Sequence, residues 1–305
     1  MAWRSVLKRQ PTELELQRSI EHVATQDRIF SEPNHDGALQ EDLEDILSRT
    51  ADSLVLNLNA ENAVTANGKQ FVVESVSDLS GQGHHATQSQ PDAQPTLVAD
   101  GIGGKPALQF DGGGQFMNLA EPILAEPLCT IVCVVRDDHG SGHRTLFSNW
   151  SGRDGNSTSS LFLGLTAENT VRFSDAFGSA GEVSDRTKPF ILSAVNGQNS
   201  ASVFQNGQLL KSANQLSKRR LDTPWVIGQQ GNIDGEFWKG SVAEIRVYER
   251  ALTDRERRSV ETQLAEHYGI LMYSEKPVPQ RDRQTLALAS LCHVLMNSNE
   301  FLFID

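Results

Sequence analysis

Two acidic, glycine-rich stretches carry residue types that bind metal ions. Residues 78–85 read Asp-Leu-Ser-Gly-Gln-Gly-His-His, and Asp78 with nearby carbonyl oxygens would suit Ca²⁺. The same pattern is typical of a tight turn in which the aspartate accepts hydrogen bonds from backbone N–H groups. Residues 137–143 hold two aspartates and two histidines, which could form a metal loop, but their position between two predicted strands favours a mobile hairpin tip. On the predicted strand at residues 242–248, Glu244 is a second carboxylate with a claim on calcium.

Hydrolytic chemistry has little support in the sequence. Glycoside hydrolysis needs two carboxylates that face each other across a cleft. No predicted strand reads Glu-x-Asp-x-Glu; Glu244 is alone on its strand, and Glu236 precedes that run. The chain also has neither a Gly-x-Ser-x-Gly nucleophile elbow nor a phosphate loop. We therefore expect a protein that is not an enzyme.

Aromatic residues in polar loops are the best candidates for contact with a sugar. An exposed aromatic ring can stack on the apolar face of a sugar. Trp150 lies in Ser-Asn-Trp-Ser-Gly and Phe177 lies in a glycine- and serine-rich stretch, so these two are the predicted ligand-binding residues. Trp225 and Trp238 lie beside apolar runs, and we expect both of them in the core.

Composition excludes several classes of function. The 305 residues carry a formal net charge of -12, whereas phosphate-backbone recognition needs clustered lysine and arginine. No stretch approaches the roughly 18 apolar residues of a membrane-spanning helix, and the first residues have no apolar signal core. Three cysteines are too few for a disulfide scaffold, and Cys129 and Cys133 are predicted to be buried free thiols within one strand.

Short apolar runs separated by Gly, Asn and Asp fill most of the chain. The predicted strands are residues 54–58, 71–76, 107–110, 128–135, 145–148, 161–165, 171–173, 190–195, 202–205, 225–227 and 242–248. Asn206-Gly207 predicts a hairpin turn, because both residues tolerate positive φ. Many short strands without intervening helices indicate a mainly β fold. We predict a two-sheet antiparallel jelly-roll sandwich with flanking N- and C-terminal helices.

The hydrophobic period changes inside residues 240–270. The β-branched and aromatic run up to Tyr248 predicts a strand, and Thr253-Asp-Arg-Glu256 then forms a capping box that begins a helix. Gly269 is the natural end of that helix. A strand that leads directly into an amphipathic helix predicts that the helix packs back on the sandwich.

Both ends of the chain read as helical. Residues 1–50 contain a capping box, Thr12-Glu-Leu-Glu15, and a second helix at about 38–49; residues 286–305 are apolar enough to need a partner. We expect these two segments to pack together as one host domain, with the sandwich of residues 53–270 inserted between them and residues 271–285 as a linker.

The sandwich resembles the laminin-G-like, concanavalin A-like jelly rolls of lectins and glucanases. The resemblance lies in residues 54–60 (LVLNLNA), 78–87 (DLSGQGHHAT), 104–112 (GKPALQFDG), Asn206-Gly207 and 240–270. In many members of this group the last strand carries Asp-Glu where this chain has Ala243-Glu244. The resemblance implies a binding fold, and the missing carboxylate weakens the implied calcium site.

The flanks resemble the C-terminal helical part of a large planctomycete surface-protein family. The similar stretches are residues 9–15 (RQPTELE) and 291–305 (LCHVLMNSNEFLFID). Members of that family often carry a cytochrome c-type module, but this chain has no Cys-x-x-Cys-His and no haem role is carried over. The resemblance implies that the chain is the C-terminal piece of an envelope-associated or extracellular protein, or a truncated form of one.

These observations favour a non-catalytic module that binds a glycan or a protein surface through its loops. The alternative is a purely structural spacer without a ligand. Exposed aromatics on one sheet would favour binding, and a smooth polar surface would favour the spacer.

Overall fold

The computed structural model describes residues 9–31, 43–66, 71–138, 141–150, 161–174, 177–219, 221–231, 235–273, 288 and 290–292. The chain divides into two compact units. The first unit comprises Met1–Glu41 and Ser274–Asp305, and the second comprises Asp42–Tyr273. Most of the predicted linker 271–285 and of the predicted helix 286–305 lies outside the described residues. None of the helices that the structure describes is long and apolar enough to span a bilayer.

The first unit contains the helix α2 (Glu13–Ser31). Its start confirms the predicted capping box: the Glu15 backbone N–H donates to Thr12 Oγ1 at 3.3 Å, and the Thr12 N–H donates to the Glu15 carboxylate at 2.7 Å. His22 Nε2 lies 3.1 Å from Ser290 Oγ, so α2 contacts the C-terminal part of the chain within this unit.

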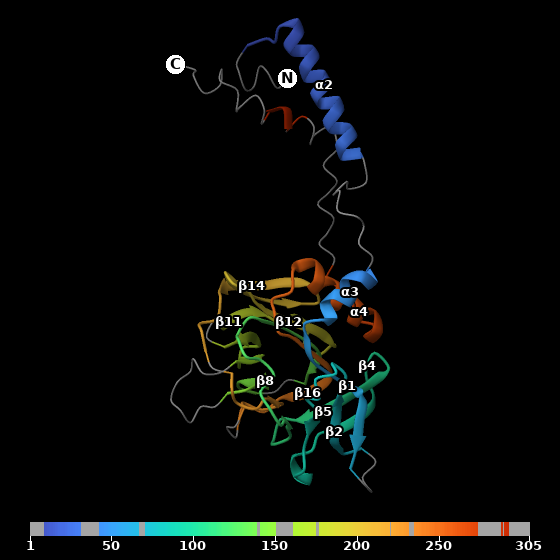
Figure 1. Cartoon of the computed structure of the whole chain (residues 1–305), viewed down its shortest axis with the longest axis vertical. Coiled ribbons are helices and arrows are strands. Elements are labelled where there is room, and N and C mark those ends of the chain that lie inside the picture. Colours follow the sequence, from blue (N-terminus) through green and yellow to red (C-terminus); the bar gives the residue numbers. More distant parts are fainter. Residues whose placement is uncertain are drawn as a thin grey trace. The chain divides into compact units, whose positions relative to one another are not determined.

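The second unit is built from sixteen described strands and two α-helices (Figure 1). The strands are β1 (Leu54–Thr65), β2 (Val73–Asp78), β3 (Ala86–Thr87), β4 (Thr96–Ile102), β5 (Lys105–Asp111), β6 (Met117–Leu119), β7 (Cys129–Asp137), β8 (Arg144–Ser148), β9 (Phe162–Leu165), β10 (Thr170–Phe173), β11 (Phe177–Glu182), β12 (Phe190–Asn196), β13 (Ser200–Gln205), β14 (Gln208–Asn214), β15 (Val226–Ile227) and β16 (Lys239–Tyr248). The helices are α3 (Leu43–Ala51) and α4 (Asp254–Tyr268), and η1 (Pro91–Ala93) is a single 3₁₀ turn.

Every strand pair among the described residues is antiparallel, which confirms the predicted class. The main ladder runs β11-β10-β9-β8-β15-β6-β3-β2-β1-β16-β7-β12-β13-β14. One apolar core takes Leu163 and Phe173 from one end of this order and Cys133 and Leu192 from the other. The ladder therefore folds over, and its two halves enclose the core as in a sandwich. Because β1 pairs with both β2 and β16, the two halves remain one continuous ladder.

Core positions agree with the residue types. Trp225 and Trp238 are fully buried, as predicted. Cys129 and Cys133 are buried free thiols, and burial raises the pKa of Cys129 to about 12. The Asn206-Gly207 turn joins β13 to β14, with φ of 49° and 83°.

The stretch from β16 to α4 folds as predicted. Glu256 N–H donates to Thr253 Oγ1 at 3.3 Å, Thr253 N–H donates to Glu256 at 2.8 Å, and Gly269 ends the helix at φ 64°. An apolar cluster that includes Val134, Ile191 and Leu264 joins α4 to the sheet. Helix α3 lies beside α4 in Figure 1 and belongs to this unit, although the sequence placed residues 1–50 together.

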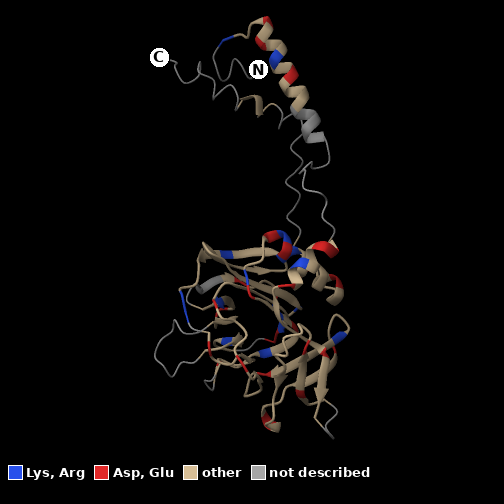
Figure 2. Cartoon of the chain, viewed as in Figure 1, with Lys and Arg blue, Asp and Glu red and all other residues tan. Residues whose placement is uncertain are grey.

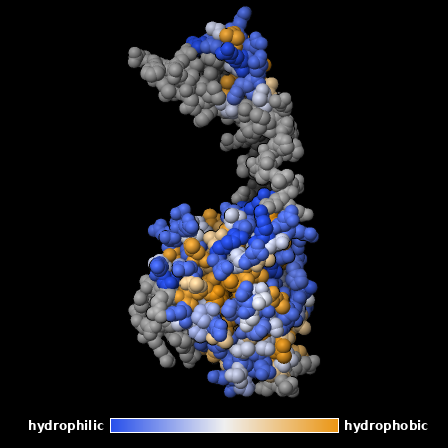
Figure 3. Space-filling model, viewed as in Figure 1, coloured by the Kyte–Doolittle hydropathy of each residue, from blue (hydrophilic) through white to orange (hydrophobic). Residues whose placement is uncertain are grey.

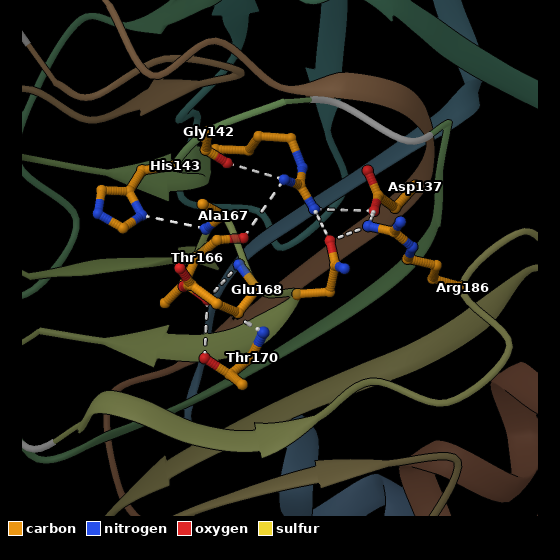
Figure 4. A network of polar contacts seen from close by, with 10 residues as sticks. Asp137, Gly142, His143, Thr166, Ala167, Glu168, Thr170 and Arg186 are labelled. Carbon is orange, nitrogen blue, oxygen red and sulfur yellow. Dashed lines mark hydrogen bonds and ion pairs between the residues drawn. The ribbon is translucent and has the colours of Figure 1, made fainter.

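A buried ion pair crosses from one half of the sandwich to the other. Asp137 ends β7, Arg144 begins β8, and the Asp137 Oδ2–Arg144 Nη2 distance is 2.9 Å, with both side chains almost completely buried. Figure 4 shows this network, which continues to Arg186 and to the β9–β10 turn. The predicted hairpin tip therefore begins only after Asp137, and residues 141–143 are exposed. The cluster holds the loop before β8 in place.

Candidate functional site

Trp150 follows the end of β8 by two residues, and its backbone is held on two sides. Its N–H donates to Ser148 Oγ at 2.9 Å. On the other side lies Gly231, which has a φ of +56°. A Cβ added to Gly231 would lie 2.0 Å from the Trp150 carbonyl oxygen, so only glycine allows this close approach. The loop that carries the tryptophan is therefore positioned by the fold.

The Trp150 side chain is partly exposed and packs on Phe162. The two ring centroids are 5.7 Å apart at an interplanar angle of 69°, an edge-to-face arrangement. Phe162 is 8 % exposed and precedes the core residue Leu163 in β9, so its side chain lies on the outer face of the sheet. The indole N–H of Trp150 is buried and has no acceptor among the described residues, so the ring itself is what a ligand could reach.

An ion pair adjoins this aromatic pair. Arg172 stands between the core residues Val171 and Phe173 in β10 and therefore also faces outward. Its Nη1 donates to Glu236 Oε2 at 2.6 Å, and its guanidinium carbon lies 4.8 Å from the Phe162 ring centroid. The outer face thus joins two aromatic rings, a cation and a carboxylate.

Glu236 is held in place by β8. Its Oε2 also accepts from Thr145 Oγ1 at 3.0 Å, and its backbone oxygen accepts from the Thr145 N–H at 2.7 Å. Its φ of 49° is in the left-handed region, which a glutamate rarely adopts and which these contacts maintain. The carboxylate is therefore aimed by the fold rather than free to rotate.

Trp150, Phe162, Arg172 and Glu236 together are called the Trp150 cluster. The side chains of Arg172 and Glu236 are 14 % and 23 % exposed. Within the described part of the chain, Glu236 Oε1 and the Nε and Nη2 groups of Arg172 have no protein partner. The cluster therefore offers an apolar ring beside one acceptor oxygen and two donors, which is the set of contacts that a sugar uses.

Of this cluster, only Trp150 was predicted as a ligand contact. Arg172 carried a usable signal, because it is a charged residue between two apolar residues of a predicted strand. Glu236 had none, since it lies 64 positions from Arg172 and meets it only after the strands pair. Phe177, the second predicted contact, lies opposite Phe173 in the β10–β11 pairing, but its side chain is outside the described residues and its ligand role stays a prediction.

Asp78 lies at the end of β2 and is largely buried by the turn that follows it. Its Oδ1 accepts from the N–H groups of Asn57 and Ser80 at 2.9 and 3.0 Å; its Oδ2 accepts from the Ser80 hydroxyl and the His84 N–H at 2.7 and 3.0 Å. Burial opposes ionisation, but these four hydrogen bonds outweigh it and hold the pKa of Asp78 below its ordinary value. The arrangement favours the turn anchor over the calcium ligand, the two alternatives that the sequence left open.

Glu244 lies beneath α4 and is only 3 % exposed. Its Oε2 accepts from Tyr268 OH at 2.9 Å and from Asn59 Nδ2 at 3.1 Å, and its Oε1 accepts from Arg246 Nε at 2.6 Å. These contacts tie α4 to the sheet. No group of three metal-ligating side chains occurs within the described residues.

Comparison with known proteins identifies the fold. The model of the family described as concanavalin A-like lectin/glucanases superfamily matches residues 111–256. A sialidase from Trypanosoma rangeli, solved with sialic acid, superposes with a TM-score of 0.50 at 16 % identity, over 84 % of this chain and 39 % of the sialidase. Domain 4 of an extracellular GH43 arabinanase from Geobacillus stearothermophilus, solved with arabinotriose, has a TM-score of 0.47 at 15 % identity, over 68 % of this chain and 98 % of that domain.

The likeness to the sialidase concerns the fold alone, because the sequence identity is so low. No curated protein matches the sequence.

Proposed function

We propose that this chain, which carries a domain of the concanavalin A-like lectin/glucanases superfamily, is a non-catalytic module that binds a glycan at the Trp150 cluster. The observation that carries the proposal is the position of an aromatic pair beside a partly exposed ion pair, where Phe162 and Arg172 face outward from β9 and β10. The family description supports a sugar as the ligand.

The contacts suit a sugar ring in number and kind. A pyranose or furanose presents an apolar face of C–H groups to an aromatic ring and hydroxyl groups at its edge. Glu236 Oε1 can accept from one hydroxyl, and the Arg172 N–H groups can donate to others. Hydrogen bonds to charged groups contribute about 1.5–3 kcal/mol each. The favourable free energy of two such bonds and one stacked ring exceeds the entropic cost of association by enough for weak, reversible binding.

The same cluster supports binding without hydrolysis. Glycosidases place a second carboxyl group about 5–9.5 Å from the first. Glu236 is the one carboxylate of the Trp150 cluster among the described residues, and Arg172 and Thr145 both bind its Oε2.

The surface also favours binding over the spacer alternative. Figure 3 shows apolar residues gathered on the viewed face of the second unit, with polar residues around them. A gathered apolar surface with a polar border is typical of an interaction site. In a larger envelope-associated protein, such a module would attach its host to a polysaccharide.

The test is binding of the full chain to a panel of immobilised polysaccharides. The wild type is expected to bind at least one of them, and Trp150→Ala to lose at least about tenfold in affinity. Phe71→Ala is the matched control, because Phe71 is an aromatic residue that is exposed outside the cluster. Equal loss in both variants, or no binding to any polysaccharide, would contradict the proposal, and the second result would favour the spacer.

A further inference from the structure

We infer that the ligand of the Trp150 cluster is an uncharged sugar chain rather than a polyanionic one such as a polyuronate or a sulfated glycan. This inference rests on the proposed function, because it names the class of sugar that the same site accepts. It follows from the charges of the side chains that meet at the cluster.

The two charges within the cluster cancel. Arg172 would be the natural partner for a carboxylate or sulfate of the ligand, but its Nη1 is already 2.6 Å from Glu236 Oε2. The second oxygen of Glu236 accepts no hydrogen bond within the described residues and would repel an anion that approached the free donors of Arg172. An uncharged hydroxyl can use both groups at once, because it donates to the carboxylate and accepts from the guanidinium.

The neighbouring cations do not restore a positive field. Arg144, which precedes Thr145 in β8, is buried and pairs with Asp137 at 2.9 Å, and Arg186 reaches the same aspartate at 3.3 Å.

Charges on the rest of the protein point the same way. Figure 2 shows Lys and Arg interspersed with Asp and Glu along the strands and helices of the second unit. The formal net charge of the chain is -12, which disfavours the approach of a polyanion at low ionic strength. Uncharged glycans experience neither this repulsion nor the screening that salt would bring.

The experiment measures binding of the full chain to neutral arabinan, galactan, xylan and mixed-linkage glucan, and to anionic polygalacturonate and heparin, by isothermal titration. We expect binding among the neutral polymers only, with a Kd that changes less than about twofold between about 0.05 M and 0.5 M NaCl. Glu236→Gln keeps the shape and the acceptor for Thr145 but leaves Arg172 unpaired. This variant is expected to gain salt-sensitive binding to the anionic polymers. Its affinity for the neutral polymers is expected to fall about three- to tenfold.

Glu266→Gln is the matched control, since Glu266 is exposed on α4 and its substitution changes the net charge of the protein by the same amount. This control should leave the affinities for the neutral and for the anionic polymers unchanged. Salt-sensitive binding of the wild type to polygalacturonate or heparin would overturn the inference while the glycan-binding proposal stands. Binding to none of the polymers would contradict both the inference and the glycan-binding proposal. A thermal melt of each variant shows whether a loss of affinity is measured on folded protein.

Discussion

The Arg144 Nη2–Asp137 Oδ2 distance is 2.9 Å, and neither side chain has more than 1 % of its surface exposed. The pair connects the first residue of β8 to the last residue of β7, which lie in opposite halves of the sandwich. Arg144 also donates to the Gly142 and Thr166 carbonyl oxygens and to Asn169 Oδ1. This one guanidinium therefore organises the loop before β8, and Thr145, the next residue, positions Glu236 of the Trp150 cluster.

Arg144→Met should destabilise the protein strongly. The substitution leaves the Asp137 carboxylate buried, with the partly exposed Arg186 as its remaining cation. Breaking a buried ion pair by removing one partner costs about 3–5 kcal/mol. Urea unfolding would measure this loss. Arg186→Gln is the control and should cost clearly less, because Arg186 is 22 % exposed; equal losses in the two variants would contradict the role given to Arg144.

Gly231→Ala should weaken glycan binding although the residue touches no ligand. An added Cβ would lie 2.0 Å from the Trp150 carbonyl oxygen, so the Trp150 backbone must move. We expect a loss of affinity of about tenfold or more, together with some loss of stability from the positive φ. Gly114→Ala provides the comparison: Gly114 also has a positive φ, but its added Cβ meets no atom within 4 Å. If folded Gly231→Ala protein bound the glycan with unchanged affinity, the position of the Trp150 backbone would have no role in binding.

The start of α4 should make stability depend on acid pH. Two hydrogen bonds from Arg250 lower the pKa of Glu256 from 4.5 to about 2, despite an opposing effect of burial. Because the pKa in the folded state is below that in the unfolded state, the stabilisation is complete above about pH 4.5 and is lost as the pH falls towards about 2. Glu256→Gln retains a capping side chain but not the charge. The stability difference between wild type and this variant, from urea unfolding, should therefore shrink over this range.

A difference between wild type and Glu256→Gln that stayed constant from about pH 5 to about pH 2 would contradict the assigned pKa shift. Glu266→Gln serves as the control, because it removes an exposed carboxylate from the same helix.

Calcium should have no effect on the melting temperature. All four acceptor positions of Asp78 are occupied by hydrogen bonds from Asn57, Ser80 and His84, so the carboxylate has none to offer an ion without breaking the turn. Asp78→Ala should destabilise the protein by about 1–3 kcal/mol in the absence of any metal, because buried N–H donors lose their acceptor. A thermal melt with and without Ca²⁺ and a chelator checks both statements. If Ca²⁺ raised the melting temperature of the wild type and Asp78→Ala abolished that rise, Asp78 would be a calcium ligand after all.

Regular patterns in the sequence account for most of the second unit. The β16–α4 seam was predictable because a strand period gives way to a capping box, and the β13–β14 turn because Asn-Gly has a defined backbone preference. The strand β4 was missed. It pairs with β5, and Gly103 and Gly104 close that hairpin at positive φ.

The candidate site was less predictable, for a physical reason. Trp150 could be chosen as an aromatic residue among polar neighbours, but Phe162 and Arg172 become its neighbours only through the pairing of β8, β9 and β10. Asp137 appeared in a polar, glycine-containing stretch that resembles an exposed loop. Arg144 and Arg186 are the cations that allow Asp137 to be buried. The sequence around Asp137 gives no sign that these two arginines will contact it.

The most direct test of the central claim follows the tryptophan indole N–H signals by NMR while a glycan that binds the chain is titrated. Trp150→Phe assigns the Trp150 signal by its loss, and the fully buried Trp225 and Trp238 provide internal references. We predict that the Trp150 signal shifts in proportion to bound glycan while those of Trp225 and Trp238 remain in place. A saturating glycan that leaves the Trp150 signal unmoved would contradict the assignment of the binding site.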